Sequence, residues 1–135
     1  MAITISERRD IAPSNILDLY RANKWSSAEK PQELINALRN SHTLFSAWDC
    51  DKLVGIGNAI SDGYLVVYYP HLLVHPNYQG KGIGQLIMKK MKDKYSDFHM
   101  QILTADEQAV DFYKKVGFVR AGQTEPMWIY SGDEH

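Results

Sequence analysis

The sequence predicts an α/β domain in which helices flank a mixed, mostly antiparallel central sheet. Three runs rich in β-forming residues follow one another between residues 42 and 75, with short polar turns between them, as expected for antiparallel strands. Segments with the helical spacing of apolar residues stand before and after these runs. Together these observations favour a layered α/β domain.

The first half of the chain is expected to supply one strand, two helices and then three strands. Residues 2–7 alternate between apolar and polar side chains, which is typical of a strand. Pro13 and Pro31 each stand where the first turn of a helix accepts proline, so one helix is expected from Pro13 to about Ala22 and a second from Pro31. The three strands are expected at residues 43–48, 52–61 and 64–75.

The second half alternates between helix and strand patterns, and we find no internal repeat or linker that divides it. Helices are expected at about 81–95 and 107–116, and strands at about 98–103, 118–121 and 126–130. A chain of 135 residues with 44% hydrophobic residues can bury one sizeable core, so residues 1–135 are expected to form a single domain.

The composition indicates which partners and compartments to expect. The 15 basic and 16 acidic residues nearly cancel, so no overall field attracts nucleic acid or an anionic membrane, and a small molecule is the expected partner. Cys50 is the sole cysteine, which rules out an intramolecular disulfide and suits a reducing compartment. No apolar run approaches the roughly 20 residues of a membrane span, so we expect a cytoplasmic protein.

Three glycines at alternate positions, Gly80, Gly82 and Gly84, stand at the start of the helix expected from residue 81. The first turn of a helix has free N–H groups and the positive end of the helix dipole, which together suit a phosphate or a pyrophosphate. Glycines would let such a ligand approach the backbone closely. A plain turn between a strand and a helix would account for the same glycines.

Two common phosphate-binding loops do not fit these residues. A dinucleotide fingerprint that starts at Gly80 requires glycine at position 85, where this chain has Gln85. A P-loop requires Ser or Thr directly after Gly-Lys, whereas Gly82 follows Lys81 here.

Two blocks resemble the GNAT superfamily of acyl-CoA-dependent N-acetyltransferases. In "LLVHPNYQGKGIGQLIMKKM" a hydrophobic strand is followed by the family's Gln/Arg-x-x-Gly-x-Gly/Ala loop, which Gln79, Gly82 and Gly84 match. In "ADEQAVDFYKKVGF" the residues that match the family's second block, in order, are Ala109, Phe112, Tyr113, Gly117 and Phe118. The preceding strands stand in the family's order, so the resemblance covers most of the chain from about residue 42.

The resemblance implies acetyl-CoA as the cosubstrate, with no metal, and a V-shaped splay between the two central strands. It implies that the main chain of Leu72, Leu73 and Val74 pairs with the pantetheine arm. The residues implied to surround the pyrophosphate are Gln79, Gly80, Lys81, Gly82, Ile83, Gly84 and Gln85. A solvated lysine at the start of a helix is the alternative for Lys81. A homodimer is a further family-level expectation.

Tyr113 occupies the family's position for the general acid that protonates the departing CoA thiolate. Its spacing from Phe112 and Val116 is also that of an ordinary packed face of a helix, so core packing is the alternative for Tyr113.

Asp106 stands where the family usually has an asparagine that contacts the pantetheine arm, and it retains only the acceptor. Thr104 and Glu107 form a T-x-x-E capping-box pattern, in which Asp106 would merely favour the positive end of the helix. The same block also resembles the branch of plant plastid and cyanobacterial serotonin (arylalkylamine) N-acetyltransferase-like proteins, where aspartate belongs to the pattern.

The general base has no direct match, because Gln101 stands where several family members have a glutamate. His71 is the candidate in its place, since its ordinary pKa of about 6.5 allows it to accept a proton at neutral pH. A water chain could perform the same task. His71 and His75 lack an evident third ligand for a metal, and a structural role is the alternative for each histidine.

The residues considered for an aromatic acceptor pocket are Trp25, Tyr64, Tyr68, Tyr69 and Trp128, although each is also explained by core packing. The sequence therefore predicts direct acetyl transfer from acetyl-CoA to a small primary amine, with an arylalkylamine as the candidate acceptor. The alternative from another class is a non-catalytic acyl-CoA-binding sensor or interaction module on the same fold.

Overall fold

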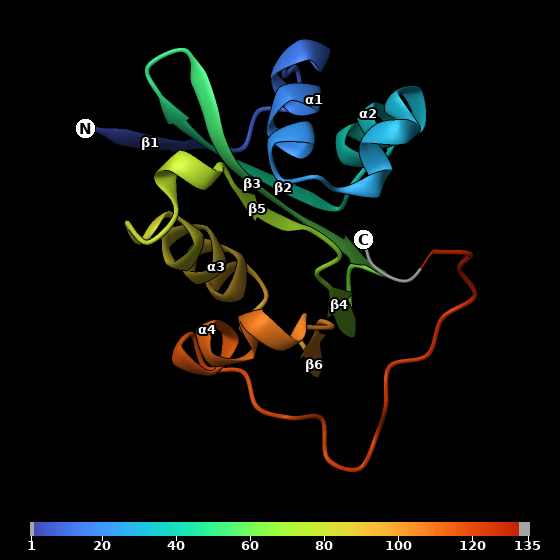
Figure 1. The fold of residues 1–135 in the computed structure, drawn as a ribbon. Coiled ribbons are helices and arrows are strands. Elements are labelled where there is room, and N and C mark those ends of the chain that lie inside the picture. Colours follow the sequence, from blue (N-terminus) through green and yellow to red (C-terminus); the bar gives the residue numbers. More distant parts are fainter. Residues whose placement is uncertain (1, 133–135) are drawn as a thin grey trace.

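The computed structural model describes residues 2–132, which form one sheet with helices on both of its faces (Figure 1). The strands are β1 (Ile3–Ser6), β2 (Thr43–Asp49), β3 (Lys52–Ser61), β4 (Val66–Tyr68), β5 (Leu72–Val74) and β6 (Met100–Ile102). The α-helices are α1 (Pro13–Ala22), α2 (Pro31–Arg39), α3 (Ile83–Lys94) and α4 (Val110–Lys115). Short 3₁₀ turns are η1 (Ser26–Glu29), η2 (Pro76–Tyr78) and η3 (Glu107–Ala109).

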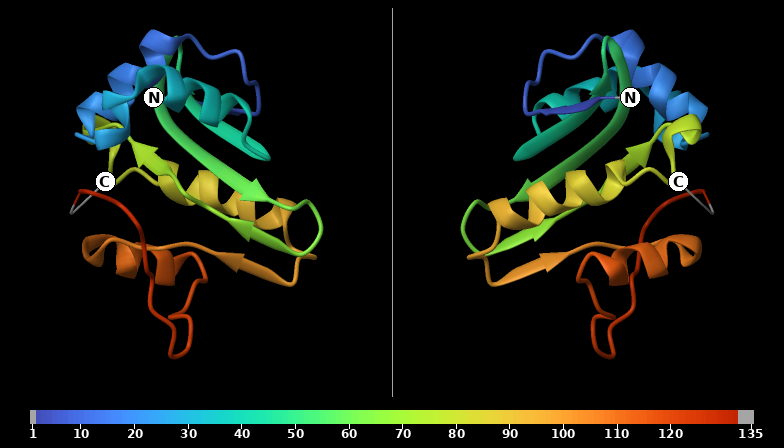
Figure 2. Two further views of the ribbon diagram at one scale, coloured as in Figure 1. Left: turned by 90° about the vertical axis from the view of Figure 1, so that its right-hand side faces the viewer. Right: turned by 90° about the vertical axis from the view of Figure 1, so that its left-hand side faces the viewer.

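The sheet is mixed and mostly antiparallel, which confirms the predicted fold class. Strands β1, β2 and β3 pair antiparallel in that order, and β3 then pairs with both β4 and β5. Strand β6 pairs with β4 in parallel. Helices α1 and α2 cover one face of this sheet, and α3 and α4 lie on the opposite side (Figures 1 and 2).

The segment 64–75, predicted as one strand, is interrupted between β4 and β5. Pro70 has no N–H to donate, and the side chain of Asn58 on β3 takes over the pairing next to it. Its Oδ1 accepts from the main-chain N–H of His71 at 3.0 Å, and its own main-chain N–H donates to the His71 carbonyl at 3.1 Å. This local exchange holds β5 on β3 where β4 has already ended.

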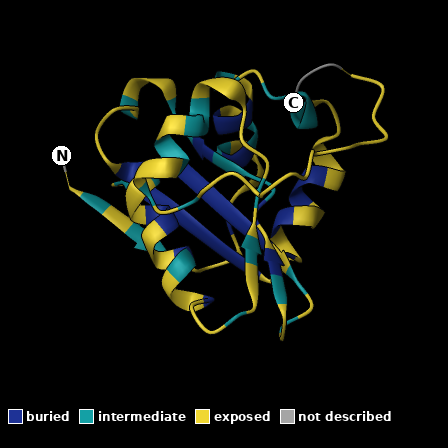
Figure 3. Cartoon of the chain, turned by 90° about the horizontal axis from the view of Figure 1, so that it is seen from below, coloured by how far each residue is buried: buried dark blue, intermediate teal, exposed yellow. Residues whose placement is uncertain are grey.

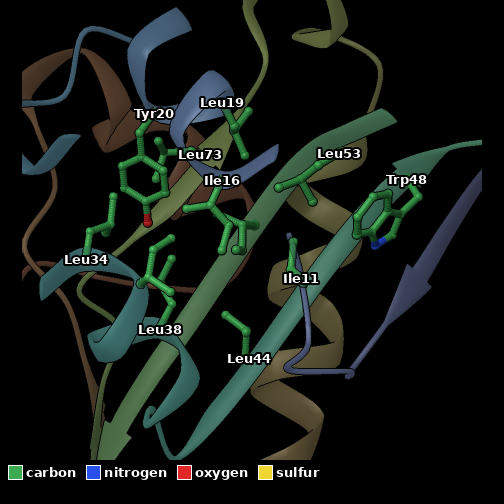
Figure 4. Packing of buried hydrophobic residues seen from close by; sticks show 12 residues of the cluster. Ile11, Ile16, Leu19, Tyr20, Leu34, Leu38, Leu44, Trp48, Leu53 and Leu73 are labelled. Carbon is green, nitrogen blue, oxygen red and sulfur yellow. The ribbon is translucent and has the colours of Figure 1, made fainter. Parts of the chain in front are cut away.

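Two hydrophobic cores pack against the two faces of the sheet. The core under α1 and α2 contains Tyr20, Leu38, Leu44, Trp48 and Leu73 among others (Figure 4). The core under α3 contains Phe45, Val54, Ile87, Met91 and Tyr95 among others. Because both faces are covered, β2 and most of β3 are buried along nearly their whole length (Figure 3).

The strands predicted at 118–121 and 126–130 are wrong, because residues 117–132 contain no strand or helix in the described structure. A turn interrupts this segment where the Gly122 N–H donates to the Arg120 carbonyl at 2.8 Å. Farther along, the hydroxyl of Tyr130 lies 2.8 Å from that of Ser26 in η1. The segment is therefore anchored on the helical layer and not on the sheet. Across residues 2–132, no helix is both long and apolar enough to cross a membrane.

Candidate active site

A cleft opens where β5 diverges from β6. The pairing between β4 and β6 ends beyond the hydrogen bond from the Tyr69 N–H to the Ile102 carbonyl (3.1 Å), while β5 continues along β3. The resulting cavity of about 620 Å³ lies among β5, the loop before α3, and α4. Its lining contains Leu72, Val74, Tyr78, Gln79, Gly80, Gly82, Ile83, Gly84, Gln85, Gln108, Ala109, Phe112, Tyr113 and Lys115.

The main chain of β5 presents alternate residues to this cleft. Leu73 pairs with Ile56 of β3, and its side chain is only 2% exposed, in the opposite core. In an antiparallel strand, successive residues direct their N–H and C=O groups to opposite sides, so the main chains of Leu72 and Val74 are directed away from β3. The Val74 carbonyl accepts from Nε2 of Gln79 at 3.0 Å. The main chains of Leu72 and Val74 can therefore pair with a ligand in the cleft, whereas the main chain of Leu73 is directed toward β3.

The glycine loop lies at one end of the cleft and has the shape required by a ligand that approaches the backbone. Gly80 and Gly82 have φ values of 78° and 85°, a conformation that side-chain-bearing residues rarely adopt. A Cβ built at either position would meet no atom within 4 Å, so both face open space. Gly82 is the N-cap of α3, whose first-turn N–H groups have no partners within the helix.

Gly84 has a different role from its two neighbours. A Cβ on Gly84 would lie 3.2 Å from Cζ of Phe112, so this glycine allows α3 and α4 to pack closely. Lys81 is exposed and is not among the residues that line the cleft. The three alternate glycines thus divide into two that leave space for a ligand and one that serves packing.

Tyr113 on α4 lines the cleft and is half-buried. Its ring packs against Phe112 and Phe118, with centroids 5.1 and 5.9 Å away. Burial, and then the negative charge of Asp106, raise the pKa of Tyr113 to about 12. The phenol therefore retains its proton at neutral pH, and no residue within 2–132 accepts a hydrogen bond from it. A protonated hydroxyl in a cleft can supply a proton to a leaving group.

The capping box predicted from Thr104 and Glu107 does not form. The N-cap of η3 is Asp106, and no side-chain hydrogen bond caps this turn in the described residues. The Asp106 carbonyl accepts from the Ala109 N–H at 2.8 Å, and Asp106 does not line the cleft. The helix predicted over about 107–116 consists of η3 followed directly by α4, which together span residues 107–115.

His71 lies in the break between β4 and β5 and contacts α1. Its Nδ1 is 2.7 Å from the hydroxyl of Tyr20, and its ring meets that of Trp25 edge-on at 5.0 Å. Burial raises the pKa of Tyr20, so its phenol is neutral. If the phenol donates to Nδ1, the neutral imidazole carries its proton on Nε2; only the reverse arrangement leaves Nε2 as an acceptor. His71 does not line the cleft between β5 and α4.

His75 has separate contacts from His71. Its Nδ1 accepts from the Asn77 N–H at 3.1 Å and so caps η2, and its ring meets that of Tyr78. Burial and the charge of Lys52 lower the pKa of His75. No group of three or more His, Cys, Asp or Glu side chains within residues 2–132 could hold a metal ion.

Gln101 has a structural task that the sequence did not reveal. Its Oε1 accepts from the Tyr69 hydroxyl at 2.7 Å, and its Nε2 donates to the carbonyl of Tyr95 at 3.2 Å. The amide thereby connects β6 to the end of α3. A glutamate in this place would lose the donor and would set a carboxylate oxygen against a carbonyl oxygen, so the amide suits this site better than a base does.

The five aromatic residues considered for one acceptor pocket do not assemble into it. Tyr69 belongs to the core under α3, whereas Tyr64 is 88% exposed and Trp128 is 61% exposed. Of the five, Trp25 lies beside His71. The C-terminal segment also reaches this area, because Tyr130 contacts Ser26 and packs against Trp128 at 5.4 Å.

A mixed sheet that opens beside a glycine loop at a helix N-terminus defines the GNAT class of acetyltransferase. The chain belongs to this family: residues 8–126 match the family described as acetyltransferase (GNAT) domain. The GNAT family uses acetyl-CoA as its cosubstrate.

Individual proteins support the assignment. A solved GNAT family acetyltransferase from Streptococcus pneumoniae superposes with a TM-score of 0.82 and 30% identity, covering 97% of this chain and 100% of that one. The uncharacterized N-acetyltransferase ycf52 of Pyropia yezoensis is 30% identical over 125 residues, 87% of this chain and 71% of the relative. The chloroplastic GCN5-related N-acetyltransferase 2 of Arabidopsis thaliana is 38% identical over 69 residues, 50% of this chain and 27% of that protein.

The match spans less than half of some other relatives. It covers 38% of the ycf52 protein of Gracilaria tenuistipitata var. liui and 41% of that of Porphyra purpurea.

Proposed function

We propose that this N-acetyltransferase transfers the acetyl group of acetyl-CoA directly to a small primary amine, and that an arylalkylamine is its preferred acceptor. The observation that carries the proposal is Tyr113, a half-buried phenol whose pKa is raised to about 12, in the same cleft as the open glycine loop. One end of the cleft thus offers anion-binding N–H groups, and its wall offers a proton donor.

Different residues along the cleft bind different parts of acetyl-CoA. The N–H groups at the start of α3 bind the pyrophosphate, with Gly80 and Gly82 leaving room for it. Leu72 and Val74 present main-chain groups to the pantetheine arm along β5. Burial, and then the charge of Asp106, raise the pKa of Tyr113 and keep its phenol protonated.

In the reaction, the neutral amine forms a bond to the thioester carbonyl carbon, and the carbon–sulfur bond then breaks. Tyr113 donates its proton to the departing thiolate and regains one from solvent. The attacking nitrogen releases a proton to a base. We propose His71 for this task through the tautomer in which Nδ1–H donates to Tyr20, or else a water chain that ends at His71.

The choice of an arylalkylamine rests on the surroundings of His71. The Trp25 ring meets the imidazole edge-on, with the ring centroids 5.0 Å apart. Flat aromatic surfaces favour an aryl ring over a hydrated polyamine chain. The "ADEQAVDFY" block that resembles the serotonin N-acetyltransferase-like branch agrees with this choice.

A panel of amines tests the acceptor class. Burial of an aryl ring contributes roughly 1 to 3 kcal/mol, so we expect tryptamine or serotonin to exceed spermidine and free lysine in kcat/KM by about one to two decades. All amines are compared at one pH so that their protonation is comparable. Equal or better activity on spermidine or lysine would reject the arylalkylamine and leave the acetyltransferase activity intact.

A further inference from the structure

A second pocket, of about 460 Å³, lies beside the acetyl-CoA cleft, and no step described above uses it. The two cavities share Gln85 on α3 and Lys115 on α4, so they adjoin at these two residues. The lining of the second pocket consists of Gln85, Lys89, Lys92, Asp93, Lys115, Val116 and Gly117.

The second pocket is cationic, with three lysines against one carboxylate, Asp93. On α3, Gln85, Lys89 and Lys92 are spaced i, i+4 and i+7, so they share one face of the helix. Gln85 and Lys115 line the side of the pocket that adjoins the cleft, and Lys89 and Lys92 follow Gln85 along α3.

Lys92 has a structural role, because it connects α3 to the end of α4. Its Nζ donates to the Val116 carbonyl at the C-terminal end of α4, where a positive charge is favourable. Gly117 makes room for this contact, because a Cβ there would lie 2.7 Å from the Lys92 Nζ. Lys89 and Lys115 are exposed, and neither forms a salt bridge with another residue in the range 2–132.

We propose that Lys89 and Lys115 form a binding site for a phosphate monoester, and that its ligand is the 3′-phosphate of CoA. This proposal rests on acetyl-CoA occupying the cleft as described above. The 3′-phosphate is carried on the same ribose that is joined to the pyrophosphate, so it must lie close to the start of α3. Lys89 follows Gln85 by one turn, a rise of about 6 Å along the helix axis.

The chemistry of the pocket suits this ligand. A phosphate monoester carries nearly two negative charges at neutral pH, and lysine ammonium groups bind it as point charges. Two lysines from different helices could approach the phosphate from both sides of the groove. The site would distinguish CoA from pantetheine thioesters that lack the 3′-phosphate.

Calorimetric titration with CoA and with 3′-dephospho-CoA tests the site. We expect the wild-type chain to bind CoA about tenfold more tightly than dephospho-CoA, with a smaller ratio at high salt because the lysines are exposed. In the double variant Lys89→Met and Lys115→Met, CoA affinity should fall to that of dephospho-CoA, whose own affinity should not change. Methionine retains most of the aliphatic stem, which preserves packing.

Lys90→Met with Lys114→Met is the matched control. These lysines belong to the same two helices and are exposed, but they do not line either pocket. The control removes the same net charge and should keep the tenfold preference. Equal binding of CoA and dephospho-CoA by the wild type, or equal loss in both double variants, would overturn the phosphate site. If the wild type bound neither ligand, both the phosphate site and the proposed function would be overturned.

Discussion

Replacing Tyr113 with phenylalanine is expected to lower the turnover number by about 100-fold or more, while the affinity for CoA changes little. The variant retains the ring, and with it the packing against Phe112 and Phe118, and removes only the hydroxyl. The expected effect is therefore on proton donation to the departing thiolate and not on the fold.

Turnover must be measured under conditions in which chemistry limits the rate. Tyr64→Phe is the matched control, because Tyr64 is 88% exposed and its hydroxyl lies outside the cleft. Wild-type turnover in Tyr113→Phe would reassign this residue to packing. Because the pKa of Tyr113 is raised to about 12, its protonated form persists at neutral pH, and activity that depends on this proton should decline only as the pH approaches that value.

Gly82→Val is expected to weaken the binding of acetyl-CoA by roughly 10- to 100-fold. The branched side chain would fill the open space above the first turn of α3, where the N–H groups are available to an anion. Loss of one or two hydrogen bonds to a charged group accounts for an effect of this size.

The substitution also carries a backbone cost, since Gly82 has a φ of 85°. A residue with a Cβ in this conformation costs about 1 to 2 kcal/mol of stability. Gly63→Val supplies the control, because Gly63 has a φ of 86° in the turn between β3 and β4, away from the cleft. Both variants should melt at lower temperature, and only Gly82→Val should lose affinity. Unchanged affinity in a folded Gly82→Val variant would contradict the assignment of the loop.

Much of the fold follows from local sequence signals. Pro13 and Pro31 mark the first residues of α1 and α2, and the apolar spacing after Gly82 marks α3. Each of these signals involves only a few neighbouring residues. A helix can therefore be predicted from them without knowing which residues pack against it. The glycine loop and Tyr113 lie in two short blocks of sequence that resemble the GNAT family, and this resemblance implies their roles.

The remaining features depend on residues that are distant in the chain. The break between β4 and β5 requires Asn58, whose side chain bonds to His71. The role of Gln101 depends on Tyr69 and on the end of α3. A pattern of apolar residues predicts a strand, but it does not identify which edge will pair with it. For this reason the segment 126–130 resembles a strand in sequence and yet lies outside the sheet.

The central claim is that this chain uses acetyl-CoA to acetylate an amine, and thiol release from acetyl-CoA measures it most directly. With the purified chain, we expect slow release in the absence of an acceptor and a large, saturable increase when a primary amine is added, together with stoichiometric N-acetylated product. Binding of acetyl-CoA with no amine-dependent release of thiol for any primary amine would contradict the account and would favour a non-catalytic acyl-CoA-binding module.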